Sequence, residues 1–211
     1  MKPKKCALVS TPRSGTHYLR MSLDNHPKMR WTGEFFRNCM SISKSYERIK
    51  SYIYNGLCST VIDHFDCVGF VWHLNLKSDL SFSAVDKIIL LERKYRLAQF
   101  VSLKIAQKTD QWYNVITTEK IEIEKEEFFS YINEQDKLYK NFKSLGLEYK
   151  IVYYEDLCNN FDQTICSIQE YLGVDYFKVT PSKFLKQETR PLREVIKNYE
   201  EMKIYDGFYK I

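Results

Sequence analysis

Three short apolar runs along the chain predict buried β-strands. They lie at residues 6–10 (CALVS), 87–93 (KIILLER) and 149–157 (YKIVYYEDL), and together they are rich in β-branched and aromatic residues. Continuous apolar runs of this kind are typical of parallel sheets, because helices cover both faces of such a sheet. A weaker run at residues 67–74 (CVGFVWHL) predicts a further strand between the first two.

Apolar residues at helical spacing follow these strands. The patterns predict helices at 16–25, 95–108 and 124–145, and Gly146 is suited to end the last of them. The alternation predicts a single α/β domain over residues 1–211, with a parallel sheet of about four to five strands flanked by helices. Ligands of such sheets bind at the carboxyl ends of the strands, so the residues that follow each strand are the candidates for a site.

Composition narrows the class of ligand. The 211-residue chain is 44% hydrophobic and carries a formal net charge of +5. Its basic residues are scattered, which suits an anionic ligand and gives no indication of nucleic-acid binding. The six cysteines form no CxxC pair, and the apolar stretch after the basic N-terminus, about five residues long, is too short for a membrane span. We therefore expect a reduced, cytoplasmic protein.

The first strand is followed by a loop, TPRSGT, that has the parts of an anion site. Gly15 permits a backbone in which successive N–H groups converge, and the hydroxyls of Ser14 and Thr16 together with a helix start favour negative charge. The alternative is a plain turn into a helix with Thr16 as its N-cap. The spacing departs from the GxxxxGK[ST] loop of ATP- and GTP-binding proteins, which disfavours triphosphate hydrolysis.

A second cation and hydroxyl follow another predicted strand. Arg93 stands at the end of the run at 87–93, and Ser102 lies nine residues later in the next predicted helix. An arginine fork and a serine hydroxyl at such a place can hold a second phosphate group. The alternative is a solvated arginine and an ordinary helix serine.

Four segments in order resemble one protein family. TPRSGTHYLR at 11–20, GEFF at 33–36, LLERKYRLAQFVSL at 90–103 and YYEDL at 153–157 resemble the sulfotransferases that use 3'-phosphoadenosine 5'-phosphosulfate (PAPS). They are more similar to the bacterial carbohydrate-sulfotransferase branch, in which the Arg-to-Ser spacing is also nine residues. The resemblance runs from about residue 5 to about residue 200 and implies a P-loop-like sheet.

The resemblance implies roles for individual residues. Arg93 and Ser102 would hold the 3'-phosphate of the donor, and Tyr154 would lie near the adenine, with a buried core tyrosine as the alternative. The stretch at 180–192 resembles a loop that closes over the nucleotide, from which Lys186, or else Lys183 or Arg190, would reach the 3'-phosphate. The residues that would surround the 5'-phosphosulfate are Arg13, Ser14, Gly15, Thr16 and His17.

Sulfuryl transfer needs charge neutralisation, an in-line acceptor and a base. Arg13 stays protonated, so it is suited to stabilise the leaving phosphate and poorly suited to donate a proton, for which His17 is a candidate. Glu34 is the preferred base, because the bacterial branch has a glutamate in a similar place and aromatic neighbours can raise the pKa of a carboxyl. His73 is the alternative base.

We expect no metal. The segment DHFD at 63–66 has residue types that bind metals, but it lacks a fourth ligand in sequence, and a solvated loop is preferred. The resulting hypothesis is an enzyme that moves a sulfuryl group from PAPS to a hydroxyl of a small molecule, glycan or glycolipid and releases adenosine 3',5'-bisphosphate. The alternatives are a nucleotide-dependent small-molecule kinase and a non-catalytic nucleotide-binding module, and a homodimer is left open.

Overall fold

A five-stranded parallel sheet forms the centre of the protein. The computed structural model describes residues 3–34, 64–74, 85–112, 118–182 and 190–207. All strand pairs are parallel, and the strands in spatial order are β2 (Met29–Glu34), β3 (Cys67–His73), β1 (Lys4–Ser10), β4 (Lys87–Glu92) and β5 (Lys150–Tyr153). The predicted class, an α/β protein with a parallel sheet of four to five strands, is confirmed.

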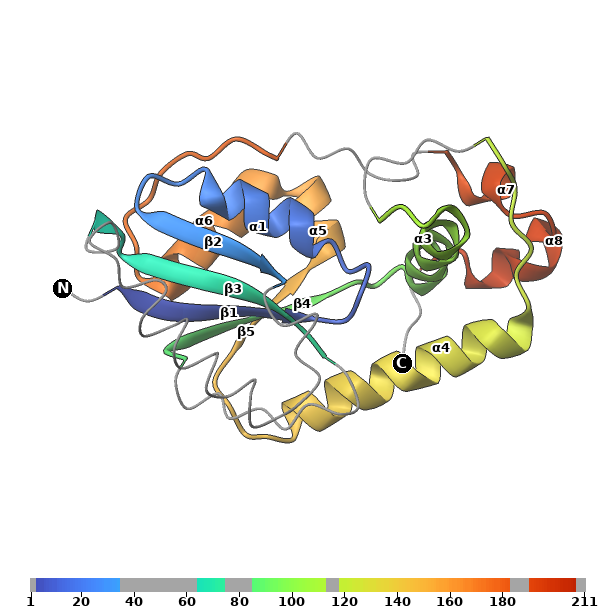
Figure 1. Ribbon diagram of the computed structural model, residues 1–211, viewed down its shortest axis with the longest axis horizontal. Coiled ribbons are helices and arrows are strands. Elements are labelled where there is room, and N and C mark those ends of the chain that lie inside the picture. Colours follow the sequence, from blue (N-terminus) through green and yellow to red (C-terminus); the bar gives the residue numbers. More distant parts are fainter. Residues whose placement is uncertain (1–2, 35–63, 75–84, 113–117, 183–189, 208–211) are drawn as a thin grey trace.

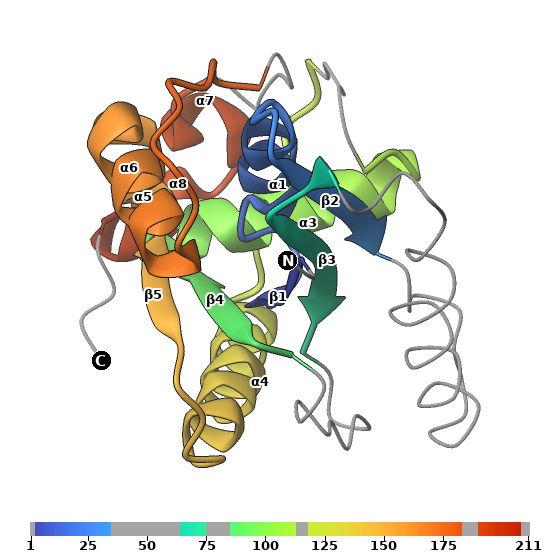
Figure 2. The ribbon, with the colours of Figure 1, turned by 90° about the vertical axis from the view of Figure 1, so that its left-hand side faces the viewer.

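Helices cover both faces of the sheet (Figures 1 and 2). Helices α1 (Thr16–Asp24), α5 (Tyr154–Asn159) and α6 (Phe161–Leu172) lie on one face, and α4 (Lys125–Lys143) crosses the other. Side chains alternate along β1 between these two layers, because successive residues of a strand point to opposite faces. Leu8 packs with the helices of the first face, whereas Val9 packs with α4.

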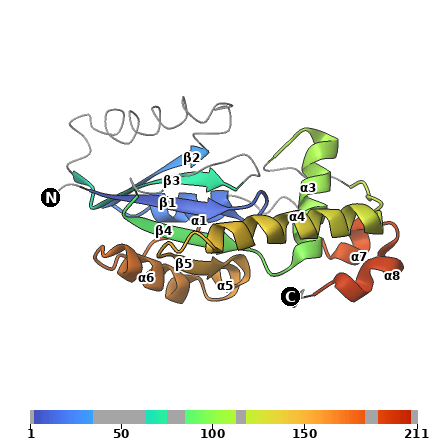
Figure 3. The ribbon, with the colours of Figure 1, turned by 90° about the horizontal axis from the view of Figure 1, so that it is seen from below.

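A second hydrophobic cluster lies beyond the carboxyl ends of the strands. It joins α3 (Arg96–Thr109) and the N-terminal half of α4 to α7 (Leu192–Val195), α8 (Tyr199–Met202) and the short 3₁₀ helix η4 (Lys203–Tyr205). Figure 3 shows α4 running from this cluster back under the sheet. The helix α4 therefore packs with both the sheet and α3, and it passes close to the edge where ligands of α/β sheets bind.

Several predicted boundaries differ from the observed ones, and two predicted elements run past their observed ends by two residues or more. The strand predicted at 149–157 ends at Tyr153, and the remaining residues form α5. The reason is tertiary, since Glu155 in α5 turns its carboxylate to the loop after β4 and accepts from the backbone N–H groups of Lys94 and Tyr95 at 3.0 Å each. The helix predicted at 124–145 ends at Lys143, before Gly146.

Two further elements were not predicted at all, β2 and α6. The short helices at the C-terminal end were not predicted either. Among the described residues, no helix combines the length and apolar character that crossing a membrane requires.

Candidate anion-binding site

The loop between β1 and α1 adopts an unusual backbone. Arg13 has φ 63° and Gly15 has φ 93°, whereas Ser14 between them is not among the described residues with positive φ. Alternating signs of φ turn successive N–H groups toward one point, which is the geometry of an anion nest. Gly15 therefore has the positive φ that its sequence position permits, and Arg13 has a positive φ that the sequence did not indicate.

The helix that follows the loop adds to this preference for anions. Gly15 is the N-cap of α1, and no side chain caps the helix. Thr16 is therefore the first residue of α1, and the alternative in which it acts as the N-cap was wrong. Because the first N–H groups of a helix carry partial positive charge, this start favours an anion. His17, the second residue of α1, is half-buried at the same place.

Tyr154 packs directly on Gly15. A Cβ atom added to Gly15 would lie 2.2 Å from Cδ2 of the Tyr154 ring, so only glycine fits here. The guanidinium of Arg93 lies 4.8 Å from the centre of the same ring and donates through Nη1 to the carbonyl oxygen of Arg13 at 3.1 Å. Burial raises the pKa of the Tyr154 hydroxyl above its usual value. Tyr154 and Arg93 together hold the glycine and the positive-φ arginine of the loop.

The side chain of Arg13 crosses to α3. Its Nε and Nη2 atoms donate to Oγ of Ser102 at 3.0 and 2.8 Å, and its Nη1 donates to the carbonyl oxygen of Trp112 at 2.6 Å. The predicted 5'-phosphosulfate arginine and the predicted 3'-phosphate serine are therefore in contact. Ser102 accepts both of these hydrogen bonds through its single side-chain oxygen.

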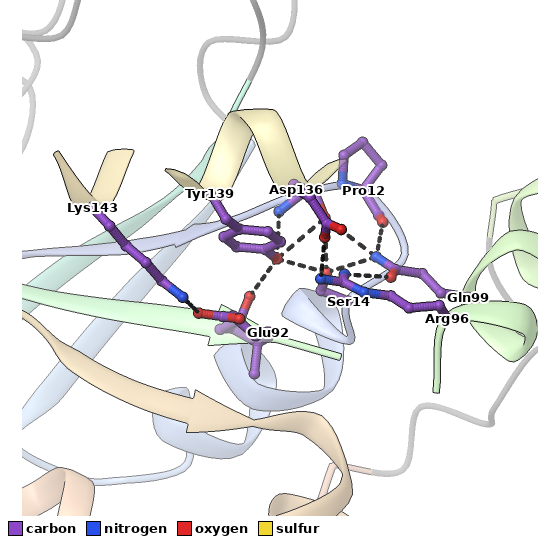
Figure 4. A network of polar contacts seen from close by, with 10 residues as sticks. Pro12, Ser14, Glu92, Arg96, Gln99, Asp136, Tyr139 and Lys143 are labelled. Carbon is purple, nitrogen blue, oxygen red and sulfur yellow. Dashed lines mark hydrogen bonds and ion pairs between the residues drawn. The ribbon is translucent and has the colours of Figure 1, made fainter. Parts of the chain in front are cut away.

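Ser14 faces away from the nest, into a buried network (Figure 4). Its hydroxyl is fully buried and accepts from Nε2 of Gln99 at 3.0 Å, and the same nitrogen donates to the carbonyl oxygen of Pro12 at 2.9 Å. Tyr139 of α4 accepts from the N–H of Thr11 at 3.2 Å. Ser14 therefore offers its backbone to the nest, while its hydroxyl holds the loop in place.

The network continues outward through α3 and α4. Arg96 donates to Oε1 of Gln99 at 3.2 Å and to Asp136 at 3.1 Å, and Lys143 lies 2.8 Å from Oε1 of Glu92. Figure 4 shows these groups next to one another along α4. The amide of Gln99 is thus oriented by Arg96, so its NH₂ group is committed to the loop.

The ends of β2 and β3 bring the two predicted bases to the same edge. His73 ends β3 and places Nδ1 3.3 Å from Oγ of Ser10, its register partner at the end of β1. Glu34 ends β2 opposite Val71, and β2 has one extra residue between Trp31 and Glu34 relative to β3. Such bulges re-aim side chains and are frequent beside active sites. The side chain of Glu34 lies outside the described part of the structure.

The structure brings most of the predicted residues together. Lys186 lies outside the described residues, and so does Asp63 of the DHFD segment. In the described ranges, no three His, Cys, Asp or Glu side chains are grouped in a way that could hold a metal ion. Gln99, Tyr139 and Glu155 support the site and were not predicted. Gln99 and Glu155 fall within the quoted segments, whereas Tyr139 has no local sequence signal, because only the packing of α4 brings it to the loop.

Comparison with known proteins identifies the fold: the chain has the sulfotransferase fold, and the predicted resemblance to that family is confirmed. The mouse sulfotransferase SULT7A1, solved in complex with PAP, superposes with a TM-score of 0.50 and 16% identity over 82% of this chain and 59% of that chain. This chain therefore spans less than two thirds of the mouse structure. The sulfotransferase domain of the Synechococcus PCC 7002 olefin synthase gives a TM-score of 0.50 and 16% identity over 83% of this chain and 75% of that chain.

A sequence comparison finds a relative that aligns with this chain over nearly the whole length of both proteins. Nodulation protein H of Rhizobium meliloti (strain 1021) is 21% identical over 229 residues, which cover 97% of this chain and 92% of that protein. No protein-family model matches the chain.

Proposed function

We propose that the protein is a sulfotransferase that moves a sulfuryl group from PAPS to a hydroxyl group of a carbohydrate or glycolipid. The contact between Arg13 and Ser102 carries this proposal, because it joins an anion nest to a second cation and hydroxyl pair around Arg93. Two adjoining phosphate-binding places suit a nucleotide that carries phosphate on both the 3' and the 5' oxygen of its ribose. The sulfotransferase fold and the structure of SULT7A1 with PAP support the same donor.

The described residues fit such a donor. The nest formed by residues 13–15 and the uncapped start of α1 would hold the 5'-phosphosulfate, and Arg93 with Ser102 would hold the 3'-phosphate. Tyr154 lies between the two places and would contact the nucleoside between them. The bound donor supplies a sulfuryl group already joined to a phosphate leaving group.

Arg13 would stabilise the charge that develops on the leaving phosphate. Its guanidinium is held by Ser102 and Trp112 in this structure, within reach of both phosphate places. A bound 5'-phosphosulfate would draw the guanidinium of Arg13 from the neutral oxygen of Ser102, because a charged acceptor binds it more strongly. His17, at the start of α1, would assist there, and preorganised positive charge of this kind is a large contribution to group transfer.

Glu34 would accept the proton of the acceptor hydroxyl, with His73 as the alternative. Glu34 ends the edge strand β2 and His73 ends β3, and both strands lie on the side of β1 away from β4, so the acceptor would approach across the ends of β2 and β3. The Nδ1 atom of His73 is within hydrogen-bond distance of Oγ of Ser10. The carbohydrate acceptor rests on the similarity of the sequence segments to the bacterial carbohydrate branch.

Ligand-dependent thermal stability tests the donor. Adenosine 3',5'-bisphosphate should raise the melting temperature strongly, since ligand at a hundredfold excess over its Kd stabilises by about 2.7 kcal/mol. ATP with magnesium should have a weak effect. The reverse order would favour a kinase and overturn the proposal. Transfer from labelled PAPS to a panel of glycans and small alcohols would then identify the acceptor, and binding without transfer would indicate a non-catalytic module.

A further inference from the structure

The unusual backbone of the anion loop needs support that the loop itself does not supply. An L-residue such as Arg13 rarely adopts a φ of 63°. The residues on both sides of it are bonded to one nitrogen, since Nε2 of Gln99 donates to the carbonyl oxygen of Pro12 and to Oγ of Ser14. The side chain of Gln99 therefore holds the conformation of the loop from the side that faces away from the nest.

Tyr139 connects this support to the sheet. Its hydroxyl accepts from the N–H of Thr11 at 3.2 Å and donates to the carbonyl oxygen of Leu91 in β4 at 2.9 Å. Leu91 precedes Arg93 by two residues, so a single buried oxygen joins the start of the loop to the strand end that carries the second cation. Burial raises the pKa of the Tyr139 hydroxyl, so the hydroxyl stays protonated. The carbonyl oxygen of Leu91 can only accept, so it receives the hydrogen of this hydroxyl.

We infer that Tyr139 is a positioning residue for the donor site. Its hydroxyl, through Thr11 and Leu91, sets the anion nest at a fixed distance from Arg93 without contacting the donor itself. The inference rests on the proposed function, because it assigns the nest to the 5' end of a nucleotide. Without this connection the N–H groups of the loop would point less uniformly toward the nest. The affinity for a phosphate would then fall, because its binding depends on the orientation of these groups.

The test compares three variants on helix α4. Tyr139→Phe removes only the hydroxyl of the network. Tyr131→Phe is the matched control, because Tyr131 is also buried on α4 and its hydroxyl has no hydrogen-bond partner among the described residues. Phe142→Leu is a second control that loosens packing next to Tyr139 and leaves the hydroxyl in place.

Two measurements are made on each variant. Hydrogen exchange of peptides that cover residues 11–19 reports the loop without any ligand. Calorimetric titration with adenosine 3',5'-bisphosphate and with adenosine 3'-monophosphate gives the affinity gained from the 5'-phosphate. In Tyr139→Phe we expect faster exchange at residues 11–19. We also expect a fall of about tenfold in the ratio of the affinity for adenosine 3',5'-bisphosphate to that for adenosine 3'-monophosphate, which is the factor that one hydrogen bond from a loop N–H group to a charged phosphate supplies. Both controls should keep the ratio of the wild type.

The outcomes separate the inference from the proposed function. An unchanged ratio and unchanged exchange in Tyr139→Phe would overturn the inference while the function stands. Equal losses of the ratio in Tyr139→Phe and Phe142→Leu would also overturn it, because they would indicate general loosening. If the wild type does not bind adenosine 3',5'-bisphosphate, the proposed function fails. The exchange at 11–19 then decides alone whether Tyr139 holds the loop.

Discussion

The two halves of the carboxyl edge of the sheet are built differently. The donor half, which is the loop of residues 11–15 together with Arg93, is fixed by backbone conformation and by hydrogen bonds from buried side chains. The acceptor half consists of the ends of β2 and β3, where Glu34 follows a bulge in the backbone and the His73 ring lies next to Ser10. Its half-buried histidine contrasts with the fully buried Ser14 of the donor half.

This difference follows from what each half is proposed to bind. A phosphate or phosphosulfate is recognised by several donors at once, and each must be held in place before the anion arrives. A base needs one side chain within reach of one proton. Substitutions in the donor half should therefore change affinity for the nucleotide, and substitutions in the acceptor half should change the rate of transfer.

The largest effect is expected in the acceptor half, from removal of the base. Glu34→Gln should lower kcat by about 10²- to 10⁴-fold, the usual contribution of a general base. The affinity for adenosine 3',5'-bisphosphate should be unchanged. Transfer of labelled sulfate and calorimetric titration measure the two quantities. His73→Ala is run in parallel, and the assignment is wrong if Glu34→Gln keeps full activity; if both variants keep it, neither residue is the base.

Two glycines, one in each half, give a direct contrast. Gly15→Ala combines a φ of 93° with a contact of 2.2 Å to Tyr154. The strain of about 1–2 kcal/mol from φ alone, plus the displaced ring, should weaken binding of adenosine 3',5'-bisphosphate by about a hundredfold. Gly33→Ala, beside the bulge of β2, has no atom of the described residues within 4 Å of the new Cβ and should bind normally. Equal losses in the two variants would contradict the contrast.

Substitution of two neighbouring cations, Arg93 and Lys94, tests whether nucleotide binding in the donor half depends on one particular side chain. Arg93→Ala removes a buried guanidinium that holds both the Arg13 carbonyl and the Tyr154 ring. It should abolish most of the preference for adenosine 3',5'-bisphosphate over adenosine 5'-phosphate, a loss of about tenfold or more. Lys94→Ala removes the same charge from the next residue, which pairs with Asp156 at the surface. If both variants lose the preference equally, the effect is a general one of net charge.

Local sequence patterns predicted the strands β1, β3, β4 and β5 and the helices α1, α3 and α4, because each has a continuous apolar run or a clear helical stripe. They did not predict β2, whose residues Met29–Glu34 mix polar and apolar types at a bulge. Nor did they predict the turn from β5 into α5 at Tyr154. That turn depends on Glu155 finding the N–H groups of Lys94 and Tyr95, a contact between segments about sixty residues apart.

The candidate site shows the same division between local and long-range information. The nest could be predicted, since glycine and hydroxyl residues after a strand and before a helix specify it locally. Its support could not, because Tyr139 is 125 residues from Ser14 and reaches the loop only through the packing of α4 under the sheet. The role of the Ser14 hydroxyl within that support was likewise hidden in the sequence.

The smallest effect is expected where the two halves meet, at Ser10 on β1. Its hydroxyl lies 3.3 Å from Nδ1 of His73 and orients the ring. If His73 contributes to transfer, Ser10→Ala should lower kcat by about threefold to tenfold, the value of one neutral hydrogen bond, and leave nucleotide affinity unchanged. A double-mutant cycle decides, because Ser10→Ala should have no further effect once His73→Ala is present. An equal loss in both backgrounds would mean that Ser10 acts through the donor loop instead, since it directly precedes Thr11.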